Sequence, residues 1–373
     1  LPHIYRGGTL RGAKLTAEAL LLGSRECGKE VENVFAHRDD PGVYARQDFA
    51  DLPAEISVRP FHWSSLSRSE ARRAMLYEGH SDWTPAHNEY GIPDDGVRQF
   101  GDCDLWLFIS DRLTLPLLPI RPFIVLAYDY LQRYVPLKLG TLGQTFIQNT
   151  RAAERVLVTT GFTRRDAIQF AGIDPDRVIK VPMLAPDVSM DHMPVDRQEA
   201  PIYFVWTTNS APHKNHVAAF EALQVYYEAL GGTLQCHIIG PDSKVLLSSD
   251  APHLRPLASI YGKSKALQDK IEVVGELSDS HYCRTLAGAA FLWHPATIDN
   301  GTFSVIEAAK LGVPSVSSDY PAMRDIDSQF GLNLFFMDRG DPRDMADKLK
   351  WMEQNFMERR DLLPSAAHLA TQT

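Results

Sequence analysis

Short apolar runs alternate with helical patterns through the second half of the chain, and this alternation predicts parallel strand and helix units. Each run has the length of a buried strand, and the intervening segments repeat their apolar residues at helical spacing. Strands are predicted at residues 201–209, 233–241, 271–277, 291–295, 313–318 and 333–338, and helices at residues 214–230, 279–290 and 341–356, with a short helix inside residues 299–321. We therefore expect a doubly wound α/β domain.

The first half is less regular, but it ends with the same kind of pattern. Strands are predicted at residues 104–110 and 121–129, and a strand, a helix and a strand at residues 155–182. The next stretch, residues 185–201, is polar, contains three prolines and has no periodicity, which predicts a linker over residues 186–200. Because domains usually contain about 100–200 residues, we expect two domains, residues 1–185 and residues 201–373.

The two ends of the chain do not look like the ends of a domain. Residues 1–23 combine a Gly-rich loop with a helix, a pair that should follow a first strand in an α/β domain, yet no strand residues precede them. The chain ends as abruptly at residue 373. We therefore expect the first strand to be missing and the chain to be a segment of a longer polypeptide, which could carry further domains.

Composition and charge narrow the choice of partners. The formal net charge of −9 argues against a nucleic-acid binder, which needs a basic surface. The four cysteines lie far apart in sequence and have no zinc-like spacing, which favours a reducing cytoplasm. No apolar run approaches the ~20 residues of a membrane span, so we expect at most a peripheral contact, at the inner face of the cytoplasmic membrane.

The stretch from Asp299 to Pro321 is the first candidate for a binding site. It follows a predicted strand, so it starts at the carboxyl end of a parallel sheet, where ligands bind. Gly301 allows a tight turn, and Thr302, Phe303 and Ser304 then present the unpaired amides of a helix start, which favour a phosphate. Glu307 lies about one turn further on. Because Ser304 to Glu307 also fits a capping box, Glu307 could instead serve only its own helix.

This stretch resembles the E-x7-E region of retaining GT-B glycosyltransferases, particularly the family 4 sugar-nucleotide enzymes, because Asp299 precedes Glu307 by eight residues across a glycine turn. The resemblance implies that Asp299 and the following amides meet the donor sugar and diphosphate, and that Glu307 holds the ribose hydroxyls. Asp299 replaces the more frequent Glu, and NGTFS replaces the commoner GFGLP. These departures leave the donor sugar open.

The segment VWTTNSAPHKNH resembles the basic segment of the same family, and the resemblance implies that Lys214 stabilises the donor diphosphate as its bond breaks. Thr208 stands where many relatives carry an arginine, so Arg324 is a candidate for the missing charge. The alternative for Lys214 is a solvated side chain at a helix start, although a lysine there opposes the helix dipole. His213 and His216 could be metal ligands only with a third ligand, which the sequence does not identify.

Weaker signals complete the predicted site. The segment VVGELSD resembles the loop whose backbone reads the nucleotide base, which assigns Glu276 and Leu277 to the donor, and Gly240 ends another strand at the same edge. In the first domain, Gly8 lies in a Gly-rich loop similar to the one that approaches the donor phosphate. Tyr128 and Asp129 stand where many relatives have a His-Asp pair, and we expect acceptor contacts there; Asp129 could equally cap the next turn.

The resemblance implies a GT-B fold of two Rossmann-like, doubly wound domains that face each other across a cleft. It also implies a retaining hexosyltransferase that needs no metal and no cofactor besides its nucleotide-sugar substrate, with a glycan or lipid-linked acceptor in surface polysaccharide or lipopolysaccharide synthesis. The alternative is a non-catalytic GT-B module, a carbohydrate-binding or scaffold part of a longer polypeptide. The departures at Asp299, Thr208 and Tyr128 favour that alternative. A dehydrogenase is disfavoured, because no GxGxxG motif follows a strand.

Overall fold

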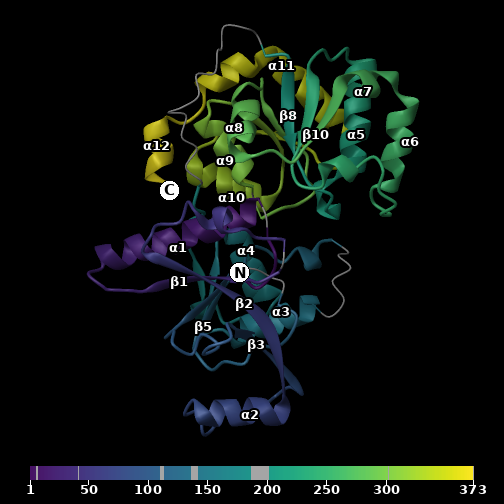
Figure 1. The fold of residues 1–373 in the computed structure, drawn as a ribbon. Helices are drawn as coiled ribbons and strands as arrows, with labels where there is room; N and C mark the ends of the chain where they lie inside the picture. Colours follow the sequence, from purple (N-terminus) through teal and green to yellow (C-terminus); the bar gives the residue numbers. More distant parts are fainter. Residues whose placement is uncertain are drawn as a thin grey trace. The chain divides into compact units, whose positions relative to one another are not determined.

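A computed structural model of the chain describes residues 1–5, 7–40, 42–109, 113–135, 142–185, 201–300 and 302–372 (Figure 1). The chain divides into two compact units, Leu1–Leu184 and Ala185–Thr373. Each unit has its own parallel sheet and its own hydrophobic core. The predicted linker, residues 186–200, lies outside the described residues.

The second unit is built on a parallel sheet of six strands in the order β10-β9-β8-β11-β12-β13. The strands are β8 (Tyr203–Thr207), β9 (Gln235–Ile239), β10 (Ile271–Gly275), β11 (Leu292–His294), β12 (Ser315–Ser318) and β13 (Phe335–Met337). From β8 the chain builds outward to β9 and β10, and it then returns to the other side of β8 to place β11, β12 and β13. This is the order of a doubly wound nucleotide-binding fold, and it reverses direction between β8 and β11.

Helices cover both faces of this sheet. They are α5 (His216–Gln224), α6 (Arg255–Lys263), α7 (Lys265–Lys270), α8 (Asp279–Ala287), α9 (Phe303–Lys310), α10 (Pro321–Phe330), α11 (Pro342–Asp361) and α12 (Ala366–Thr371). In Figure 1, α8, α9 and α10 lie together on one side of β8 and β10, and α5, α6 and α7 lie on the other. The largest core cluster joins Trp206 and Trp293 of the central strands to Phe220 of α5 and Leu349 of α11. Burial of these side chains holds β8 and β11 side by side.

The first unit contains a second parallel sheet, in the order β4-β5-β6-β7, and a smaller sheet in which β1 pairs parallel with β2 and β2 antiparallel with β3. Its strands are β1 (Asn33–Arg38), β2 (Ile56–Ser67), β3 (Glu89–Asp94), β4 (Trp106–Ile109), β5 (Phe123–Leu126), β6 (Arg155–Val158) and β7 (Val178–Lys180). Its helices are α1 (Gly8–Glu26), α2 (Arg68–Tyr77), α3 (Leu142–Ala152) and α4 (Gly161–Gln169). Figure 1 shows α2 at the far end of the long β2 and β3 pair.

The strands predicted for the second half all form, as do the strands and the helix predicted over residues 104–129 and 155–182. Helices α2, α3, α6, α7, α10 and α12 were not predicted, and neither was the small sheet of β1, β2 and β3.

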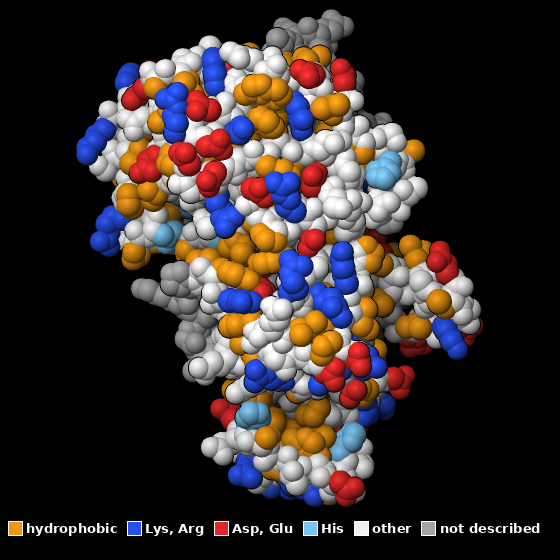
Figure 2. Space-filling view, turned by 180° about the vertical axis from the view of Figure 1, so that it is seen from behind, with side chains coloured by type: hydrophobic (Ala, Val, Ile, Leu, Met, Phe, Trp, Pro, Cys, Tyr) orange, Lys and Arg blue, Asp and Glu red, His pale blue; other side chains and the backbone are white. Residues whose placement is uncertain are grey.

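On the face in Figure 2, basic side chains lie among acidic ones and do not form one basic patch. Within the described part of the chain, no helix is long and apolar enough to cross a membrane.

Candidate functional site

The loops that follow β8 and β11 meet at the point where the strand order of the second unit reverses. β8 and β11 pair directly, so their carboxyl ends open at the same place on the sheet edge. The loop after β8 contains Thr208 and Lys214, and the loop after β11 contains Asp299 and Thr302. In open α/β sheets ligands bind at such a switch point. The sequence-predicted residues with the strongest signals therefore lie together, although Gly301 lies outside the described residues.

Lys214 and Asp299 form an ion pair across these two loops. The Lys214 Nζ atom lies 2.5 Å from Asp299 Oδ2, and the two side chains are 12% and 14% exposed. Burial by itself raises the pKa of the Asp299 carboxyl, but the positive charge of Lys214, followed by His213 and His294, outweighs it and lowers the pKa to about 2. Asp299 is therefore a carboxylate at neutral pH. Lys214 is largely buried, so it is not the solvated side chain at a helix start that was the alternative interpretation.

Asn215 fixes the position of Lys214. It adopts a left-handed backbone conformation with φ of 62°, and its side-chain amide donates to the carbonyls of Pro295 at 3.1 Å and Arg339 at 2.9 Å. The backbone amide of Thr297 also donates to the His213 carbonyl at 2.8 Å. The loops after β8 and β11 are thus hydrogen-bonded to each other on both sides of the ion pair, which gives the pair a preorganised geometry.

Helix α9 begins beside this pair, and Thr302 is its N-cap. The Thr302 hydroxyl accepts from the Ser304 amide at 3.3 Å, and Thr207 at the end of β8 donates to the Ser304 hydroxyl at 3.0 Å. Phe303 is the first residue of the helix. The alternative of a capping box from Ser304 to Glu307 is wrong, because Thr302 is the N-cap and Glu307 lies five residues beyond it.

Glu307 is fully buried in the second unit. Its Oε2 atom accepts a hydrogen bond of 2.5 Å from the hydroxyl of Tyr282 on α8. A side chain that serves only as a cap would lie at the helix end, whereas Glu307 lies inside the second turn of α9 and is held from a neighbouring helix. The structure therefore does not support the capping role, and the role of Glu307 toward a ligand stays a prediction.

Thr208 is buried, and its hydroxyl contacts a histidine instead of facing solvent. It is 5% exposed, and its hydroxyl lies 3.2 Å from His216 Nε2, which also lies 2.8 Å from the Asn209 carbonyl. Burial lowers the pKa of His216 to about 4, so the ring is neutral at pH 7. Within the described residues no three metal-ligating side chains group together, so the metal-ligand alternative for His213 and His216 still lacks a third ligand.

Gly240 lets the ends of β8 and β9 approach closely, and Gly275 leaves room for the side chain of Lys244. A Cβ atom at Gly240, where φ is +133°, would lie 2.1 Å from the Thr208 carbonyl oxygen, and one at Gly275 would meet the side chain of Lys244. The predicted base-reading residues follow Gly275: Glu276 is exposed and Leu277 is half-buried. Gly240 therefore has a structural requirement at this edge that is independent of any ligand.

The remaining predicted residues, Gly8, Tyr128 and Asp129, belong to the first unit. Gly8 is the first residue of α1, directly after Gly7 with φ of 59°. Tyr128 is half-buried, and its carbonyl accepts from the Thr163 hydroxyl at 3.3 Å. Asp129 Oδ1 accepts from the Leu131 amide at 3.0 Å, so Asp129 caps the following turn as the alternative stated.

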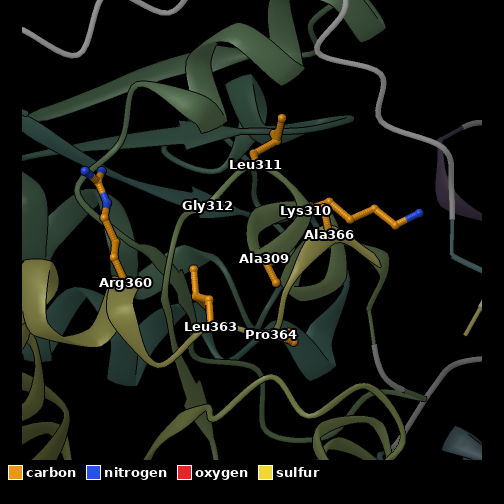
Figure 3. A pocket seen from close by; sticks show the side chains of 8 residues that line it. All are labelled: Ala309, Lys310, Leu311, Gly312, Arg360, Leu363, Pro364 and Ala366. Atoms are coloured by element: carbon orange, nitrogen blue, oxygen red, sulfur yellow. The ribbon is translucent and has the colours of Figure 1, made fainter. Parts of the chain in front are cut away.

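Two other features lie apart from the switch point. Arg324, the candidate for a phosphate charge, makes a two-pronged contact with Asp319 at 2.8 and 2.6 Å, so a phosphate that binds Arg324 would compete with that carboxylate. A cavity of about 360 Å³ lies at the other end of α9 and is lined by Lys310, Leu311 and Arg360 among others (Figure 3). Figure 3 shows the Lys310 side chain extending away from the cavity, so its charge does not converge with that of Arg360.

Sequence reasoning missed Thr207, Asn215 and Tyr282 at this site. Thr207 and Tyr282 act through hydrogen bonds to residues about 97 and 25 positions away, a relation that no local pattern encodes. Asn215 had a signal, because asparagine is one of the few residues that tolerate a left-handed conformation directly before a helix.

Part of the second unit matches a known protein family. The sequence model of the family Glycosyl transferases group 1 matches residues 192–368. Among curated proteins, none matches the chain significantly. The match lies in the second unit, which contains the Lys214 and Asp299 pair, and it supports a glycosyltransferase.

Several solved structures are similar in fold. Anabaena Alr3699/HepE in complex with UDP and glucose has a TM-score of 0.64 and 13% identity over 100% of this chain and 96% of that one. A glycosyltransferase from Rickettsia africae ESF-5 has a TM-score of 0.63 and 14% identity over 100% and 94%. WaaG, a glycosyltransferase involved in lipopolysaccharide biosynthesis, has a TM-score of 0.61 and 13% identity over 99% and 92%. The fold is therefore that of the GT-B glycosyltransferases, with two Rossmann-like domains.

Proposed function

We propose that this chain is a nucleotide-sugar glycosyltransferase whose donor binds at the switch point of the second unit. The observation that carries the proposal is the preorganised Lys214 and Asp299 pair beside the first turn of α9, inside the segment that matches the group 1 family. A cation and the free amides of a helix start both favour a diphosphate, and a carboxylate accepts hydrogen bonds from sugar hydroxyls. The three features lie where a doubly wound sheet binds its ligand.

In the proposed reaction the bond between the donor sugar and its diphosphate breaks, and the sugar passes to an acceptor hydroxyl. Negative charge grows on the departing diphosphate, and Lys214 stabilises it together with the α9 amides. Asp299 holds Lys214 in place and binds the sugar. We further propose retention of the anomeric configuration by a front-face reaction, in which a leaving phosphate oxygen takes the acceptor proton and no metal is needed.

The donor and acceptor classes belong to the proposal as well. The Anabaena protein of similar fold was solved with UDP and glucose, so UDP-sugars are the first donors to test. WaaG acts in lipopolysaccharide biosynthesis, which supports a glycan or lipid-linked acceptor, and we place the reaction in the cytoplasm, at the inner face of the membrane if the acceptor is a lipid.

The test is a panel of sugar nucleotides screened by thermal stabilisation, followed by assays of nucleotide release and of glycosylated product with the donor that stabilises most. The expected result is release by the parent protein and strongly reduced release by Lys214→Met, which keeps the length of the side chain but removes its charge. The rival function, a non-catalytic carbohydrate-binding module, is favoured by the departures at Asp299, Thr208 and Tyr128. It predicts binding of a sugar nucleotide without release from the parent or the variant.

A further inference from the structure

His294 and Tyr320 form a buried, hydrogen-bonded pair at the carboxyl ends of two neighbouring strands. His294 is the last residue of β11, and Tyr320 follows the end of β12 by two residues and is the N-cap of α10. Each residue is 1% exposed, and His294 Nε2 lies 3.0 Å from the Tyr320 hydroxyl. A buried imidazole and a buried hydroxyl cost free energy when they are not hydrogen-bonded, so each side chain holds the other in place.

The pair completes a closed ring of contacts at the sheet edge. Asn215 donates to the carbonyls of Pro295 and Arg339, and the guanidinium of Arg339 donates in turn to the Asp319 carbonyl. Pro295 directly follows the histidine of the pair, and Asp319 directly precedes its tyrosine. The hydrogen bond between the histidine and the tyrosine therefore closes the ring, which joins the loops after β8, β11, β12 and β13 to one another.

Both members of the Lys214 and Asp299 ion pair lie next to this ring. Lys214 directly precedes Asn215, and Asp299 lies five residues after His294 in the loop that follows β11. Burial, followed by the positive charge of Lys214, lowers the pKa of His294 to about 3, and the carboxylate of Asp299 acts in the opposite direction. The imidazole is therefore neutral at pH 7 and lies close enough to the ion pair to be affected by both of its charges.

We propose that Tyr320 and His294 are positioning residues for sugar transfer. Their hydrogen bond holds the loop after β11 at the distance from the loop after β8 at which Lys214 and Asp299 act as one unit. The proposal rests on the proposed function, because transfer is the step that needs this geometry. Both side chains are enclosed in the second unit, so they act through the ion pair and not by touching the donor.

Tyr320→Phe tests this role with a small change, because it removes only the hydroxyl. A displacement of about 1 Å can cost about a hundredfold in rate, and for the loss of one hydrogen bond of the ring we expect kcat to fall about tenfold. The affinity for the nucleoside diphosphate should be unchanged, because Lys214 acts mainly in the transition state. In a Lys214→Met background the same substitution should change the remaining turnover by less than about twofold, because the charge that the ring positions is gone.

The experiment measures steady-state nucleotide release and sugar transfer with the donor from the panel, beside titration with the nucleoside diphosphate of that donor. Tyr227→Phe is the matched control: Tyr227 is also buried, and its hydroxyl donates to the Leu234 carbonyl at 3.0 Å, at the amino end of β9 and away from the site. It should lower the melting temperature as Tyr320→Phe does and keep the kcat of the parent. His294→Gln, which keeps a hydrogen-bonding nitrogen near the place of Nε2, should retain more turnover than His294→Leu.

Other outcomes overturn the inference in distinguishable ways. If the parent transfers sugar and Tyr320→Phe keeps its kcat, or loses no more than Tyr227→Phe, the positioning role is wrong and the proposed function stands. The same holds if Tyr320→Phe slows the parent and Lys214→Met by the same factor, because its effect then does not pass through the ion pair. If the folded parent transfers no sugar from any donor of the panel, the proposed function fails and this inference fails with it.

Discussion

The ammonium of Lys214 lies 2.5 Å from the carboxylate of Asp299, although the two residues are 85 positions apart in sequence. The family resemblance gave them separate ligands, the diphosphate and the sugar, whereas the structure makes them one electrostatic unit. Because both side chains are largely buried, removal of either one leaves the other charge without its partner. Variants of the two residues are therefore not independent.

We predict that Lys214→Met lowers turnover far more than it weakens nucleotide binding. If Lys214 stabilises charge that develops as the glycosidic bond breaks, its loss removes an interaction made mainly in the transition state. By analogy with other preorganised groups, about 2.7–4 kcal/mol of barrier is at stake, roughly a hundredfold to a thousandfold in kcat. Steady-state kinetics with the donor from the screen, beside titration with UDP, measures both effects. A loss of affinity as large as the loss of turnover would contradict the prediction.

For Asp299→Asn we predict slower transfer and nearly unchanged affinity for the free nucleotide. The substitution keeps the size of the side chain and removes the charge, and the acid is assigned to the sugar and to Lys214 rather than to the nucleotide. Because the two residues form one unit, the double variant should be slowed less than the sum of the single effects. A full double-mutant cycle in kcat measures this coupling, and strict additivity would show that the ion pair has no part in the reaction.

The candidate site could be predicted from sequence only where a local pattern encodes the chemistry. Lys214 and Asp299 each lie in a short segment that follows a strand, and the topology of the sheet brings such segments together. The burial of Glu307 could not be predicted in this way. It depends on the position of Tyr282 on another helix, and the same four letters, Ser304 to Glu307, fit a capping box whose register the structure does not use.

The same holds for the fold: elements with a clear local pattern could be predicted from the sequence, and elements without one could not. The parallel sheet of the second unit could be predicted because its strands are continuous apolar runs between helices of ordinary length. Helix α6 was missed because prolines, serines and one glycine interrupt the periodicity of residues 242–265, and α7 was missed because it has only 6 residues. The smaller sheet of the first unit was missed because β2 mixes buried, half-buried and exposed positions over twelve residues without a regular alternation and contains Pro60, which argues against a strand in sequence.

Acidification should destabilise the protein between pH 6.5 and 4 in a way that depends on His216. Its burial lowers the pKa of the folded state to about 4 from the ordinary value of 6.5, so above pH 6.5 neither state binds the proton. Between pH 6.5 and 4 the unfolded state binds a proton at His216 and the folded state does not. The free energy of unfolding therefore falls by about 1.4 kcal/mol for each unit by which the pH drops. Urea unfolding of the parent and His216→Asn at a series of pH values should show a shallower slope in the variant, with His294 contributing a slope of its own in both. Parallel slopes would exclude a neutral, buried His216.

Transfer should survive a chelator. In the proposed reaction Lys214 and the α9 amides supply the positive charge that a divalent ion supplies in metal-dependent enzymes. Product formation is therefore expected to proceed at an unchanged rate after dialysis against EDTA, with and without added Mg²⁺ or Mn²⁺. Loss of product with EDTA and its recovery with a divalent ion would require Asp299 to be reinterpreted as a metal ligand.

Gly240→Ala should damage both the fold of the second unit and its nucleotide site. A Cβ atom there would lie 2.1 Å from the Thr208 carbonyl oxygen, and the backbone φ of +133° is one that an L side chain rarely adopts. Neither side can yield cheaply, because the clash is between two backbone segments at the ends of β8 and β9. We expect a loss of roughly 1–3 kcal/mol in the free energy of unfolding, and weaker UDP binding because the loop that carries Lys214 starts at Thr208. Gly262→Ala is the control: Gly262 is the penultimate residue of α6, with no atom within 4 Å of an added Cβ, and an alanine there should stabilise the protein by at most about 0.5–1 kcal/mol, the value for a helix interior. Urea unfolding and UDP titration of both variants make the comparison. If Gly240→Ala proved as stable as the parent, the close approach of the two strand ends would not be a feature of the folded protein.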